Sequence, residues 1–160
     1  MTGIGSGASV NGGAHRPDRR RSGRRRGLAI AAAAAVIAAG LVVHGALPDT
    51  AATDIAGDAL YAVLIYLLVV AVAPRASAPV AAAVASGWCV AVELLQLTDL
   101  PGHAASVFPP AVLVLGTVFD PRDLVIYVVA VAITAGADVA MRRASIRRRG
   151  GSGAPPLPRR

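Results

Sequence analysis

The stretch AASVFPPAVLVLGTVF, residues 104–119, decides how many times this chain crosses a membrane. It is apolar, but Pro109 and Pro110 interrupt it, and a proline inside a helix removes a backbone hydrogen bond. Only nine residues separate Pro110 from Asp120, whereas a membrane-crossing helix needs about 17–25. We therefore predict that this stretch forms a short re-entrant or interfacial helix, which begins near Pro110 and does not cross.

The composition of the whole chain is typical of an integral membrane protein. Hydrophobic residues make up 55% of its 160 residues, and charged residues make up only 16%, compared with about 25% in soluble domains. The charges gather near the two ends of the sequence and leave long apolar stretches between them. The one cysteine, Cys89, lies in such a stretch and cannot form an intramolecular disulfide.

Four apolar stretches have about the length of a membrane-spanning helix. We therefore predict an all-α integral membrane fold with four transmembrane helices and the additional short helix. A cleavable signal peptide is the alternative for the first stretch, but its end, VHGAL, is a poor cleavage site, so we expect an uncleaved span. The predicted spans are residues 28–47, 57–73, 79–97 and 122–141.

The arginines predict the domain organisation and the orientation. Residues 1–27 and 142–160 hold seven arginines each and few apolar residues, so we expect two disordered arms around a membrane domain at residues 28–141. With four crossings, both arms and Arg75 share one side, which then holds 15 of the 16 arginines. The positive-inside rule places that side in the cytoplasm. We predict a multi-pass protein of the bacterial cell (inner) membrane with both termini cytoplasmic.

The arms have two interpretations that the sequence leaves open. They bind anionic lipid headgroups, at about 1 kcal/mol for each arginine near the surface, or they only fix the topology. We expect membrane lipids as partners, with a homo-oligomer as a further option. Nucleic acid is not expected, because the arms have no interleaved aromatic residues and the chain has no module that reads bases.

Glu93 is the only glutamate of the chain, and it lies near the end of the third predicted span. Polar residues at spacings of three, four and three share its face of the helix. A polar face turned toward lipid is costly, so we predict that this face points into the helix bundle. The residues on it are Ser86, Cys89, Glu93 and Gln96.

Two other predicted spans bring polar side chains to the same end of the bundle. Asp58 and Tyr61 stand at the start of the second span, and Asp123 and Tyr127 stand at the start of the fourth. Arg122 is the one basic residue that could neutralise these carboxylates. Asp138 lies on the same helical face as Asp123, but further along the span. The candidate ligand-binding residues are Glu93, Gln96, Asp58, Tyr61, Asp123, Tyr127 and Arg122.

The role of this polar cluster also stays open at the sequence level. Buried hydrogen bonds between membrane helices stabilise packing by about 0.6–2 kcal/mol each, so the cluster could be purely structural. Alternatively, an ionisable residue inside a membrane span marks a site for a polar headgroup, a proton or a cation. His44 and His103 lack the spacing of metal ligands, so we expect no metal site and no cofactor. No nucleophile–base motif indicates catalytic residues.

Three segments of the chain resemble a family of small bacterial membrane proteins that is filed as domain of unknown function twenty-eight-zero-nine. They are GDALYAVLIYLL (57–68), VAVELLQL (90–97) and GTVFDPRDLVIYVVAV (116–131), and the resemblance covers about residues 28–141. Family members usually carry an arginine in the loop before the short apolar segment, where this chain reads GHAASVFPP; Arg122 could substitute for it. The resemblance implies that the family pattern is carried by Gly57, Asp58, Tyr61, Glu93, Gln96, Asp123 and Tyr127.

The Glu-x-x-Gln pair and the later aspartate are also similar, more distantly, to the VanZ-like teicoplanin-resistance family. The nearer family has no established activity that the resemblance could transfer. We therefore expect a non-enzymatic envelope or accessory factor with a polar cluster near the outer membrane face. The alternatives are a module that binds or transports a lipid headgroup or a cation, and a VanZ-like envelope lipid enzyme.

Overall fold

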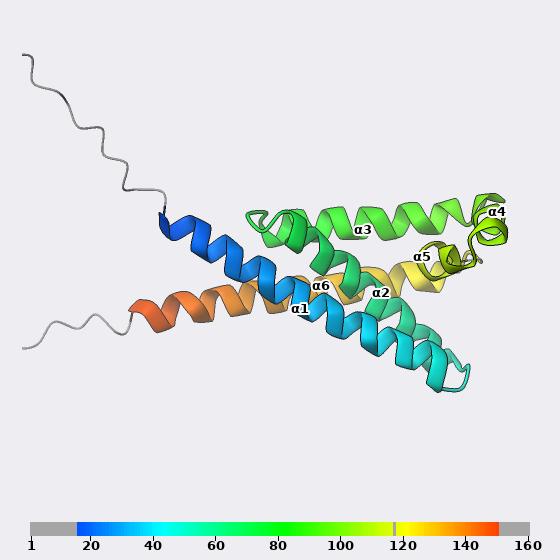
Figure 1. The fold of residues 1–160 in the computed structure, drawn as a ribbon, viewed down its shortest axis with the longest axis horizontal. Helices are drawn as coiled ribbons and strands as arrows, with labels where there is room; N and C mark the ends of the chain where they lie inside the picture. Colours follow the sequence, from blue (N-terminus) through cyan, green and yellow to red (C-terminus); the bar gives the residue numbers. More distant parts are fainter. Residues whose placement is uncertain (1–15, 117, 151–160) are drawn as a thin grey trace, which may run out of the picture.

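A computed structural model describes residues 16–116 and 118–150 of the chain, and the described residues form helices and no strands. Four long helices dominate the fold (Figure 1). Each is long and apolar enough to cross a membrane, which confirms the predicted all-α fold with four spans. They are α1 (Arg16–Ala46), α2 (Ala51–Val72), α3 (Ala78–Leu95) and α6 (Pro121–Gly150).

Local sequence signals explain where the central helices begin and end. Thr50 and Thr53 form a reciprocal capping box, so α2 starts six residues before the predicted span. It stops at Val72, just before Pro74 in the connection to α3. Pro79 lies in the first turn of α3, where a missing backbone N–H costs little.

The two arginine-rich arms differ from the predicted disorder wherever the structure describes them. Helix α1 already begins at Arg16, and α6 continues to Gly150, well past the predicted end of the span. Arginine is a good helix former, so extending an existing helix through such residues costs little. Residues 16–27 are therefore helical and not disordered, and α6 continues to Gly150, beyond the single helical turn expected after the last span; residues 1–15 and 151–160 lie outside the described part of the chain.

Helix α2 holds the bundle together, because it contacts α1, α3 and α6, and α3 also packs against α6. Fully buried small residues allow α2 and α3 to approach closely: Ala62 on α2, and Ala81, Ala85 and Cys89 on α3. Large apolar side chains cover the outer faces of the helices, and more than half of the surface of Leu41 and Ile133 is exposed. An apolar exterior of this kind suits contact with lipid.

Two short helices lie at one end of the bundle, where α3 stops and α6 begins (Figure 1). Helix α4 (Leu100–Val107) leads into a single 3-10 turn at Pro109–Ala111, and α5 (Val112–Leu115) follows. The segment stays at this end of the bundle, as predicted. It differs from the prediction in that the two prolines divide it into two helices, the first of which starts at Leu100.

The two ends of the bundle have opposite charge character. The end that carries α4 and α5 holds Asp58, Glu93, Asp120 and Asp123, and we call it the acidic end. The beginning of α1, the α2–α3 connection and the last part of α6 lie at the other end, which we call the basic end (Figure 1). Exposed arginines crowd the basic end: Arg20, Arg21, Arg24, Arg26, Arg75, Arg143, Arg147 and Arg148.

Candidate functional site

The structure brings the candidate residues from α2, α3 and α6 together at the acidic end. Tyr127 on α6 lies within electrostatic range of three carboxyl groups, those of Asp58, Glu93 and Asp123. Its side chain is almost fully buried. The spacing of the polar residues along three separate helices therefore produces one cluster in space, which we call the acidic cluster: Asp58, Tyr61, Glu93, Gln96, Asp123 and Tyr127.

Glu93 lies at the centre of this cluster and is 0% exposed. Its Oε1 accepts a hydrogen bond of 2.6 Å from the backbone N–H of Asp120, just before α6 begins. Its Oε2 is buried and has no hydrogen-bond partner among the described residues. Glu93 thus fastens the start of α6 to α3 with one oxygen and leaves the other available. The predicted inward face of α3 is confirmed for Glu93 and Cys89, and Ser86 is partly buried.

Gln96 joins α3 to the short helix α5. Its Nε2 donates a hydrogen bond of 2.7 Å to the carbonyl of Leu115, while its Oε1 is buried without a partner among the described residues. Gly116 follows with φ +62° and ψ −169°, a conformation that is essentially restricted to glycine. A Cβ at this position would also collide with the Gln96 amide. Glycine is therefore required here for two independent reasons.

The sequence analysis did not identify this role of Gly116. The available signal was a glycine directly after a short apolar segment, which is a common way to end a helix. Its close contact with Gln96 joins residues that are distant in the sequence, and no pattern in the sequence indicates it.

Arg122 contacts the cluster only from its exposed edge. Its side chain is 45% exposed and lies 3.7 Å from carboxylate oxygens of both Asp120 and Asp123. The carboxylate of Asp120 also accepts a hydrogen bond of 2.9 Å from the Arg122 backbone N–H at the start of α6. Oδ1 of Asp123 is buried and has no hydrogen-bond partner among the described residues. Arg122 therefore offers charge compensation to this oxygen from 3.7 Å without a hydrogen bond, and the Asp58 side chain also interacts with Asp123.

The Tyr61 hydroxyl is already engaged by two neighbours. It donates to the carbonyl of Val114 at 2.9 Å and accepts from the indole N–H of Trp88 at 3.0 Å. The Tyr61 and Tyr127 rings also pack together, with centroids 6.1 Å apart. Tyr61 thus ties α2 to α3 and α5. The sequence analysis missed Trp88 as its donor, because the two residues lie on different helices.

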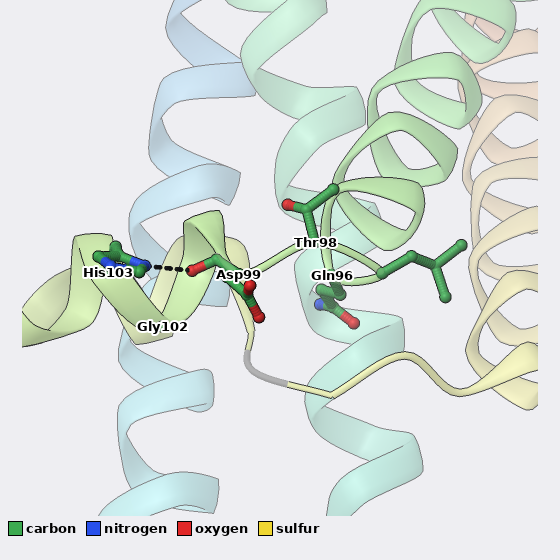
Figure 2. A pocket seen from close by; sticks show the side chains of 6 residues that line it. Gln96, Thr98, Asp99, Gly102 and His103 are labelled. Atoms are coloured by element: carbon green, nitrogen blue, oxygen red, sulfur yellow. Dashed lines mark hydrogen bonds between the residues drawn. The ribbon is translucent and has the colours of Figure 1, made fainter.

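An open hollow of about 480 Å³ lies beside the cluster, between the end of α3 and helix α4. Figure 2 shows Gln96, Thr98, Asp99 and His103 around it. The His103 ring is bonded through Nδ1 to the Asp99 carbonyl at 3.0 Å. Gln96 belongs to both the hollow and the acidic cluster, and it is the one cluster residue that lines the hollow.

Comparison with protein families gives a match over residues 47–131, just over half of the chain, to the model described as "Protein of unknown function (DUF2809)". The chain belongs to this family. The match contains every residue of the acidic cluster, together with Gly116 and Arg122. Searches of curated proteins and of solved structures give no significant match. The resemblance to DUF2809 is confirmed, and the more distant resemblance to the VanZ-like family stays a prediction.

This DUF2809 protein has a second polar network at the basic end, whose charged residues, Arg25, Asp138 and Arg142, lie outside the matched region. Asp138 on α6 is its centre, and two arginines donate to it: Arg25 at 2.7 Å and Arg142 at 2.7 and 3.0 Å. The Tyr66 hydroxyl donates a further hydrogen bond of 2.9 Å. The carboxylate of Asp138 is thus saturated with donors.

Arg25 also joins α1 to α6 and to the α2–α3 connection at the basic end. It donates to the carbonyls of Pro74 and Ala76, in the α2–α3 connection, at 2.6 and 2.8 Å. The arginine of α1 therefore binds the turn after α2 and the carboxylate of α6 at once. The sequence showed an Asp138–Arg142 spacing of four, which favours a pair on one helix, but it gave no indication of Arg25 as the third member.

Proposed function

We propose that this DUF2809 protein is a non-enzymatic envelope or accessory protein of the bacterial inner membrane that holds a polar ligand in its acidic cluster. One observation carries the proposal: Glu93 is completely buried and one of its carboxylate oxygens has no partner among the described residues. A buried acceptor without a donor costs about 1–3 kcal/mol, so a ligand that supplies the donor stabilises the protein.

The contrast between the two ends supports a ligand over a purely structural role. At the basic end, the Asp138 carboxylate accepts hydrogen bonds from three side chains, which is what a packing network requires. At the acidic end, three buried acceptor oxygens lack partners within the described part of the chain. They belong to Glu93, Gln96 and Asp123. Among the described residues, the one other buried side-chain polar atom without a partner is a donor, the Nε of Arg25 at the basic end, so the unfilled acceptors are confined to the acidic end.

The charge distribution supports an orientation with the acidic end outside. Apart from Arg122, the described exposed arginines of α1, α6 and the α2–α3 connection lie at the basic end, and the positive-inside rule places such an end in the cytoplasm. The acidic cluster then lies near the outer face of the membrane. The same arginines are suited to contact anionic headgroups of the cytoplasmic leaflet.

Native mass spectrometry of protein purified in mild detergent tests the proposal. We expect wild type to retain a lipid or another polar ligand and Glu93→Gln to lose most of it, while the two proteins have the same melting temperature once both are delipidated. Glutamine keeps an oxygen for the Asp120 N–H but removes the charge. Asp49→Asn is the matched control, because Asp49 is an exposed carboxylate at the same end, outside the cluster.

If Glu93→Gln retained as much of the ligand as wild type, the proposed site would be contradicted. The same spectra report the oligomeric state, which covers the further option of a homo-oligomer. Incubation of the protein with a lipid extract should leave all lipid masses unchanged. The appearance of a new lipid product would instead favour the VanZ-like enzyme alternative.

A further inference from the structure

We propose that the ligand of the acidic cluster carries a primary ammonium group, such as that of an aminophospholipid headgroup or of a free amine. This inference rests on the proposed function and names the chemical class of its ligand. It follows from three properties of the cluster. They are the hydrogen-bonding atoms that lack a partner, the charge of the groups around them, and the lack of a set of metal ligands among the described residues.

The unfilled groups are all acceptors. They are Oε2 of Glu93, Oε1 of Gln96 and Oδ1 of Asp123, each buried and without a hydrogen-bond partner among the described residues. The Gln96 amide nitrogen, a donor, uses one of its two N–H groups on the carbonyl of Leu115 and is not among the unfilled atoms. The ligand must therefore donate hydrogen bonds. An ionised phosphate or carboxylate group only accepts hydrogen bonds, so it could not form hydrogen bonds with these acceptor oxygens.

The charge of the cluster favours a cation. Arg122 is the basic side chain nearest to the cluster, and it reaches Asp123 only at 3.7 Å from a half-exposed position. Charge-assisted hydrogen bonds are roughly twice as strong as neutral ones, so a cationic donor gains most in this place. The carboxyl group of Asp123 interacts electrostatically with those of Asp58 and Glu93, and Glu93 also interacts with Asp120.

The geometry favours an ammonium group over a metal ion. Within the described part of the chain, no three His, Cys, Asp or Glu side chains converge closely enough to hold a metal. A primary ammonium group has three N–H donors on a tetrahedral nitrogen and tolerates more widely spaced acceptors. An ammonium group has three N–H donors, and the cluster has three buried oxygens without a hydrogen-bond partner. Gln96 is the one residue of the acidic cluster that lines the neighbouring hollow, so its buried oxygen is the one closest to that hollow.

The test compares phosphatidylethanolamine with phosphatidylcholine, whose headgroup has the same charge but no N–H donor. The protein is placed in nanodiscs that contain equal amounts of both lipids and of phosphatidylglycerol, and retained lipid is measured by native mass spectrometry. We expect roughly tenfold enrichment of phosphatidylethanolamine over phosphatidylcholine, as expected from one charge-assisted hydrogen bond. Glu93→Gln and Asp123→Asn should each abolish the enrichment, and Asp49→Asn should keep it.

A second arm distinguishes the two sources of the amine. Ethanolamine and choline are added to delipidated protein in detergent, and the melting temperature is measured. Stabilisation by ethanolamine but not by choline, without enrichment in nanodiscs, would support a free amine as the ligand. Enrichment in nanodiscs without a response to ethanolamine would support the lipid headgroup.

The outcomes separate this inference from the proposed function. Equal retention of both zwitterionic lipids by wild type, lost in Glu93→Gln, would overturn the ammonium donor and leave a ligand site in place. Preferential retention of phosphatidylglycerol would also overturn it. Retention of no lipid, together with no response to either amine, would contradict the inference and the proposed site alike. The retention of the two zwitterionic lipids is compared on the wild-type protein alone, so a variant that fails to fold does not weaken this test.

Discussion

At the scale of single residues, Gly116 shows how one backbone position supports the candidate site. Its φ of +62° with an extended ψ is reserved for glycine, and the Gln96 amide occupies the space of a Cβ. We expect Gly116→Ala to lower the free energy of unfolding by about 1–3 kcal/mol. Thermal or denaturant unfolding in detergent measures this. Gly57→Ala is the control, because a Cβ at that helical glycine meets nothing within 4 Å. Equal stability of both variants would contradict the proposed constraint.

Glu93 separates packing from ligand binding at the same scale. Glu93→Leu removes the acceptor of the Asp120 N–H and leaves that donor unpaired at the start of α6. We expect a loss of about 1–3 kcal/mol in the free energy of unfolding, whereas Glu93→Gln should stay close to wild type. Unfolding curves for the two variants provide the measurement. If Glu93→Leu is as stable as wild type, the hydrogen bond to α6 contributes nothing and the assignment of this anchor is wrong.

At the scale of helices, the network around Asp138 predicts a cost that spreads over three elements. Asp138→Ala would leave Arg25, Arg142 and the Tyr66 hydroxyl without their shared acceptor. Because these groups are partly buried, we expect a loss of about 2–3 kcal/mol and faster proteolysis near the start of α1. Arg147→Ala serves as the control, because Arg147 is exposed at the same end. A loss no greater than that of the control would show that the network is not structural.

Helices also show what the sequence can and cannot predict. The four spans follow from apolar length, and the inward position of Glu93 follows from helical periodicity, since both depend on residues close together in the chain. The contact between Arg25 and Asp138 joins residues 113 positions apart, and no spacing rule reaches that far. For the same reason, the sequence predicted a disordered arm where the structure has the first turns of α1. The arginine-rich composition of this arm does not show that one of its arginines, Arg25, pairs with a carboxylate far away in the sequence.

At the scale of the whole molecule, the separation of charge predicts the orientation. Single cysteines at Ser77 and Ser106, both exposed and at opposite ends, should react with a membrane-impermeant maleimide from opposite sides. The experiment uses full-length protein in which the buried Cys89 is replaced by alanine. We expect Ser77→Cys to react only after the cells are opened and Ser106→Cys to react in intact cells. Reaction of Ser106→Cys only from the cytoplasm would reverse the proposed topology, and with it the location of the acidic cluster.

The Arg25 clamp has a consequence for the order in which the protein is made. Translation proceeds from the N-terminus, so α1 and its arginine reach the membrane long before Asp138 leaves the ribosome. Until α6 arrives, Arg25 has only the carbonyls of Pro74 and Ala76 as partners in this network, and those appear with the α2–α3 connection. The basic end therefore closes in two steps, the second of which waits for the last span. A chain truncated before Asp138 would hold all the residues of the acidic cluster and still lack the ion pair that joins its first helix to its last.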